Sequence, residues 1–64
     1  MDEKDIWRTA ALLIKQHGRQ AGEMANLRVI DMMEKKDADG QAVWKRIAQA
    51  VEELTKVRGD EAVD

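Results

Sequence analysis

Apolar residues recur every three or four positions along this chain, and they divide it into three segments. In the first segment, about residues 3–17, this spacing predicts an amphipathic helix. Its apolar stripe consists of Ile6, Ala10, Leu13, Ile14 and His17, with Trp7 at the edge. Gly18 follows directly and suits the left-handed position that ends a helix. Leu12 breaks the pattern, because it projects onto the polar side of the predicted helix.

The second segment, about residues 20–36, predicts a helix that is apolar over much of its circumference. Its main stripe consists of Ala21, Ala25, Val29, Met32 and Met33, while Met24, Leu27 and Ile30 lie off that stripe. A helix of this kind is usually sandwiched between neighbours. Its start is poorly marked, because no capping residue precedes it and Gly22 weakens the first turn. A start as late as Asn26 is the alternative.

The third segment, about residues 41–57, has the clearest amphipathic pattern. One face carries Val43, Trp44, Ile47, Ala50, Val51, Leu54 and Val57. Asp37–Gly40 is expected to form the preceding turn, with Asp37 or Asp39 capping the helix, and residues 60–64 to form a disordered tail. The three similar lengths and short connections predict an all-α fold, a compact three-helix domain over residues 1–64. Its core is expected to centre on Trp7, Trp44 and the stripe of the second helix.

Composition removes most kinds of chemistry from consideration. The 64 residues include no Cys, no Ser and a single His. Disulfide scaffolds, cysteine-ligated metal centres and Ser-His triads are therefore excluded. Asp37-Ala38-Asp39-Gly40 is not a calcium loop, because the pattern would put Lys35 and Arg46 at two key carboxylate positions. We expect no catalytic residue, no cofactor, no metal ligand and no small-molecule substrate, and hence no enzyme.

Charge adds an expectation about partners and location. The net charge is −2 and the signs alternate along the chain, which argues against nucleic-acid binding. The alternative is a helix-turn-helix-like DNA-binding regulator built from the second helix, the turn and the third helix, with Gln41, Lys45 and Arg46 at the start of the recognition helix. The longest apolar run, Ala10–Ile14, is too short to span a bilayer. Without a recognisable leader, the expected location is the cytoplasm.

Four residues exceed what one apolar stripe per helix requires: Leu12, Met24, Leu27 and Ile30. One interpretation is that the second helix contacts both neighbours on different sides, which would bury Met24 and Leu27. The other is that the four form an exposed patch that binds a protein partner or a second copy in a homodimer. The sequence alone leaves both interpretations open, and we take the patch as the candidate interface.

The order of residues also resembles a family of proteins. A Trp near the start is followed by a spaced series of residues, namely His17-Gly18, Ala21, Ala25, Arg28, Asp39-Gly40, Trp44, Ile47 and Ala50. This series is similar to short uncharacterised proteins of alphaproteobacteria, described as hypothetical or as domains of unknown function. The resemblance implies that a helix, His-Gly, a second helix, an acidic-Gly turn and a Trp-containing helix form one unit in a bacterial protein. It implies no activity, so no residue role follows from it.

Overall fold

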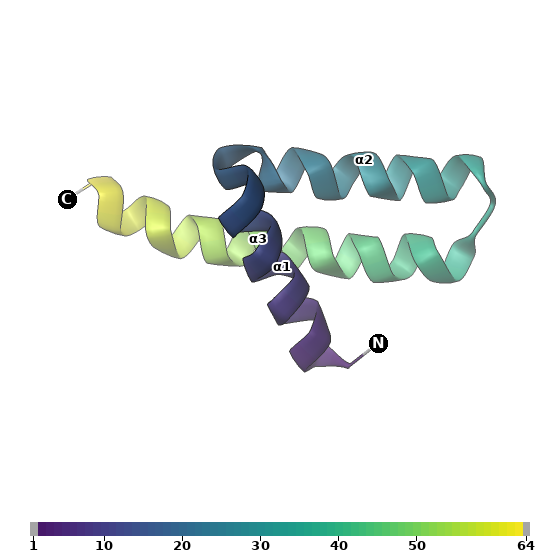
Figure 1. Cartoon of the computed structure of the whole chain (residues 1–64), viewed down its shortest axis with the longest axis horizontal. Coiled ribbons are helices and arrows are strands. Elements are labelled where there is room, and N and C mark those ends of the chain that lie inside the picture. The colour runs from purple at the N-terminus through teal and green to yellow at the C-terminus, as the bar shows by residue number, and fades with distance from the viewer. Residues whose placement is uncertain (1, 64) are drawn as a thin grey trace.

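The computed structural model describes residues 2–63, and the side chains of residues 2–56, as an all-α fold. The helix α1 covers Glu3–His17, the 3-10 turn η1 covers Gly18–Gln20, α2 covers Ala21–Glu34 and α3 covers Ala38–Val63 (Figure 1). The first predicted helix is confirmed at both ends, and the alternative start at Asn26 is wrong. The expected tail over residues 60–64 lies outside the residues whose side chains are described, and it stays a prediction.

The connection between α1 and α2 corrects the expectation of three separate helices. Helical residues form two unbroken runs, 3–34 and a second from residue 38, because the connection is itself a helical turn. The Gly18 N–H donates to the Ile14 carbonyl, and the Ala21 N–H donates to the Gly18 carbonyl. The first run changes direction at Gly18, whose φ of 59° and ψ of −124° suit glycine. Glycine therefore bends one helical run into α1 and α2.

The connection between α2 and α3 is a tight turn of three residues, 35–37. The Asp37 N–H donates to the Met32 carbonyl (2.9 Å) and the Lys36 N–H to the Met33 carbonyl (3.1 Å). These are the two hydrogen bonds of a Schellman motif, and Lys36 occupies its left-handed position at φ 59°. The motif ends α2 at Glu34, two residues earlier than predicted.

The start of α3 lies three residues before the predicted Gln41. Asp37 caps the helix, because its Oδ1 accepts a hydrogen bond from the Gly40 N–H at 2.9 Å. Gly40, expected in the turn, belongs to the first turn of α3. A Cβ atom there would lie 2.6 Å from the Met32 sulfur and 2.7 Å from an Asp37 carboxylate oxygen, so glycine leaves room for these two side chains. The chain thus reverses direction sharply, and α2 and α3 lie antiparallel (Figure 1).

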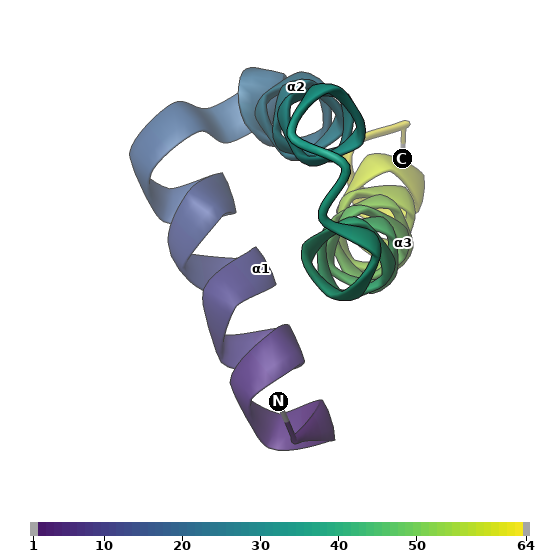
Figure 2. The ribbon, with the colours of Figure 1, turned by 90° about the vertical axis from the view of Figure 1, so that its right-hand side faces the viewer.

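The core lies where α3 packs against both α1 and α2 (Figure 2). Its buried cluster consists of Ile6, Ala10, Ala21, Ile47, Ala50 and Val51. The prediction that Trp7 and Trp44 centre the core is wrong: both are half-buried and pack against this cluster. Three of its six members are alanines, whose small side chains favour short distances between helices, and the indole rings pack at the edges of the cluster.

Candidate interaction surface

Helix α2 has two apolar faces of different character. Its inner face is buried and consists of Ala21, Ala25 and Val29. Its other face carries Leu27, Ile30 and Met33, which are 53%, 50% and 54% exposed. Their three-residue spacing places these side chains next to one another in a row along the helix. We name this row the outer stripe.

The four residues predicted as an interface do not form one continuous row. Leu12 is 51% exposed, but it belongs to α1, which lies before the bend and extends away from α2 (Figure 2). Met24 is half-buried, as the sandwiched-helix interpretation expects, whereas Leu27 and Ile30 are exposed. Two of the four therefore belong to the outer stripe.

Met33 is the exposed residue that the sequence pattern missed. The pattern assigned it to the main stripe beside Val29, but it is more than half exposed. On a helical wheel Met33 lies only about 40° from Val29, so the pattern places both on one broad stripe. Since the contact with α3 covers a narrower arc, Val29 is buried and Met33 lies beyond its edge.

Carboxylates border the outer stripe. Glu23 and Glu34 are exposed, and they lie one turn before and two turns after Leu27, on the same side of the helix. Asp31 forms an ion pair with Lys35 at 3.2 Å, which offsets its charge. The face that carries the exposed apolar side chains is therefore net acidic.

Two arginines cover the tryptophan rings at the edges of the core. The Arg46 guanidinium lies 5.6 Å from the centre of the Trp7 ring and 2.6 Å from a Glu3 carboxylate oxygen. Arg28 lies 5.9 Å from the centre of the Trp44 ring. These contacts are cation–π interactions. Arg46 thereby links the N-terminal half of α1 to α3. This residue, which was predicted to contact DNA, therefore has Trp7 and Glu3 as partners within the fold.

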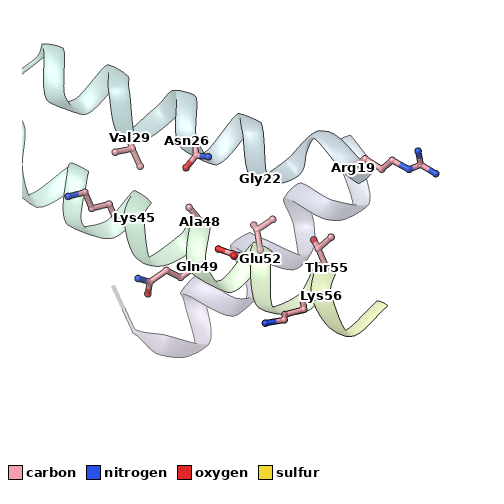
Figure 3. A pocket seen from close by; sticks show the side chains of 11 residues that line it. Arg19, Gly22, Asn26, Val29, Lys45, Ala48, Gln49, Glu52, Thr55 and Lys56 are labelled. Carbon is pink, nitrogen blue, oxygen red and sulfur yellow. The ribbon is translucent and has the colours of Figure 1, made fainter. Parts of the chain in front are cut away.

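An open groove runs between α2 and α3 (Figure 3). Gly22, Asn26 and Val29 form its α2 side, and Lys45, Ala48, Gln49, Glu52, Thr55 and Lys56 are among its α3 residues. The absence of a side chain at Gly22 widens one end. The lining mixes cations, a carboxylate and amides without a cluster of one kind, so the groove specifies no ligand chemistry.

Within residues 2–56 there is no group of three or more His, Asp or Glu side chains placed to hold a metal ion. Within the described residues, no helix is both long enough and apolar enough to cross a membrane.

Comparison of the chain with protein-family models, with curated proteins and with solved structures found no match. The resemblance to short alphaproteobacterial proteins therefore stays a prediction.

Proposed function

We propose that this chain is a small, non-enzymatic protein–protein interaction module that acts through the outer stripe of α2. One observation carries the proposal: Leu27, Ile30 and Met33 are all half-exposed and adjacent. Single exposed apolar residues are ordinary, but contiguous ones on a small domain mark interaction sites. Methionine adds a flexible side chain that adapts to different partner surfaces. A cytoplasmic, bacterial setting belongs to this proposal and rests on the sequence alone.

The DNA-binding alternative has less support. Helix-turn-helix units cross at about 90–120°, whereas α2 and α3 lie side by side and antiparallel (Figure 1). Two cations near the turn also have partners within the fold, since Lys35 pairs with Asp31 and Arg46 with Glu3. These contacts reduce the charge available for phosphate groups.

Site-specific photo-cross-linking tests the proposed function. A photoreactive amino acid at position 30 should give discrete protein adducts in an extract of cells that express the protein. The same group at position 49, which is exposed on α3, is the matched control and should give none. Leu27→Gln combined with Met33→Gln should abolish the adducts at position 30 while circular dichroism stays helical. Equal labelling at both positions, or none at position 30, would contradict the proposal.

A further inference from the structure

The outer face of α1 has the opposite character to the outer stripe. Lys4, Arg8 and Lys15 are all exposed, and their spacing of four and seven residues places them on one side of the helix. Leu12, 51% exposed, lies beside them. Arg19, in η1, adds a further exposed cation near the end of this face. We name Lys4, Arg8, Leu12 and Lys15 the basic face of α1.

Two exposed faces of the molecule therefore carry opposite charges, and each of them also carries apolar side chains. The outer stripe is bordered by Glu23 and Glu34. On the basic face of α1, Arg8 and Lys15 flank Leu12 along one side, and the cations of that face outnumber the exposed Asp5 on the other side. Arg28 is the one cation in the sequence of α2, and it lies against Trp44. Complementary charge steers two surfaces together and fixes how they align.

Building on the proposed function, we propose that the outer stripe binds the basic face of α1 of a second copy of this chain. An antiparallel alignment matches the two faces. With Leu12 opposite Ile30, Arg8 lies four residues before Leu12 and Glu34 lies four residues after Ile30. This pair therefore meets across the contact. A parallel alignment would place Arg8 opposite the uncharged Asn26 instead.

The other end of the same alignment is also complementary. Lys15 lies three residues after Leu12, and Leu27 lies three residues before Ile30, so these two side chains meet. The aliphatic stem of a lysine packs on an apolar neighbour while its ammonium group extends beyond it. One helical turn further along α2, Glu23 is in position to accept that ammonium group. The acidic border and the basic face thus match at both ends of the apolar contact.

Pairing of two outer stripes with each other is disfavoured by charge. It would bring Glu23 and Glu34 of both copies to one interface, where like charges repel. The two arrangements respond differently to salt. Screening weakens an attraction between opposite charges and relieves a repulsion between like charges. The proposed contact therefore loosens as salt rises, whereas a stripe-to-stripe dimer tightens.

The proposed contact joins two different patches. It forms a closed twofold dimer only when each copy uses its outer stripe and its basic face at the same time. Otherwise it leads to rings or larger assemblies. One helix face is smaller than the roughly 800 Å² per partner of a standard interface, so we expect association at high micromolar concentration.

Charge reversal tests the inference by analytical ultracentrifugation of the purified chain, from micromolar to millimolar concentration. Arg8→Glu or Glu34→Arg alone should weaken self-association about fivefold, because each replaces an exposed attraction with a repulsion. The double variant should return to within about twofold of the parent. Glu52→Arg, at an exposed position on α3, carries the same charge change as Glu34→Arg and should leave association unchanged.

Three results would overturn the inference: a monomer at every concentration, a double variant that stays as weak as the singles, or association that strengthens with salt. Circular dichroism of each variant confirms that the helices persist. A monomeric chain that still cross-links foreign proteins from position 30 would overturn this inference and leave the proposed function standing. A lack of any adduct at position 30 in the extract would contradict the proposed function, and a lack of one in the purified chain at millimolar concentration would contradict this inference.

Discussion

The inner face of α2 carries small apolar residues, whereas its outer face carries large ones. The inner face buries Ala21, Ala25 and Val29, while the larger Leu27 and Ile30 are left half-exposed on the outer face. If apolar burial alone oriented the helix, the larger side chains would lie inside, since fully burying a Leu or Ile stabilises by about 1.5–3 kcal/mol. The difference shows that another requirement sets the orientation of α2.

Close packing is that requirement. Short connections hold both ends of α2, with η1 at its start and the turn 35–37 at its end. Alanines on its inner face let α2 lie close to α3, and interhelical distance depends on the side chains at the contact. The larger residues are excluded from this contact. The two faces should therefore separate stability from the proposed binding, and variants in each face test that separation.

The largest expected effect lies on the α3 side of the inner contact. Ile47 is 1% exposed within the core cluster, so Ile47→Ala should destabilise the fold by about 2–5 kcal/mol. A chain of this length has only about 3–10 kcal/mol in total, so the variant should be largely unfolded or close to it. The matched Ile30→Ala, in the outer stripe, should change stability by less than about 0.5 kcal/mol.

Urea unfolding followed by circular dichroism measures both variants. Similar losses for Ile47→Ala and Ile30→Ala would remove the distinction between the faces, since Ile30 would then support the fold as much as Ile47 does.

The next effect comes from enlarging the inner face. Ala25 is fully buried at 0% exposure, so Ala25→Leu should destabilise the chain by about 1–3 kcal/mol through overpacking. Alanine and leucine are both strong helix formers, so the change reports on packing more than on helix propensity. The denaturation midpoint in urea measures the effect. Unchanged stability would mean that α2 and α3 have room to separate, contrary to the close-packing argument.

The sequence predicted the helices better than it predicted their contacts. Residues 3–17 show one apolar stripe followed by Gly18, and α1 has those bounds. The end of α2 was missed, because it depends on Lys36 in a left-handed conformation that a sequence pattern associates with glycine. The hydrogen bonds from the Lys36 and Asp37 N–H groups to the Met33 and Met32 carbonyls hold Lys36 there.

The candidate site was predicted in part for a related reason. Periodicity identified Leu27 and Ile30 as surplus, and both are exposed. It placed Met33 on the main stripe and Met24 off it, whereas Met24 is half-buried and Met33 is exposed. Which side of a helix is covered depends on the packing angle between two helices. The cations on the basic face of α1 follow the ordinary pattern of a solvated helix side, so periodicity alone does not single them out.

The smallest expected effect is an increase in stability, from a substitution at the edge of the inner face. A Cβ atom at Gly22 would lie 3.9 Å from the Val51 Cγ1, which is ordinary contact, so Gly22→Ala fits without strain. Alanine also loses less backbone entropy in a helix, and the sum should stabilise the chain by about 0.5–1 kcal/mol. The thermal midpoint should rise by about 2–8 °C for a domain of this size.

Gly18→Ala is the matched control: its added methyl group meets no neighbouring atom, but φ is 59°, so it should destabilise by about 1–2 kcal/mol. A fall in the midpoint for Gly22→Ala would show that α2 and α3 are already in contact at this position, which leaves no room for even one methyl group on the inner face.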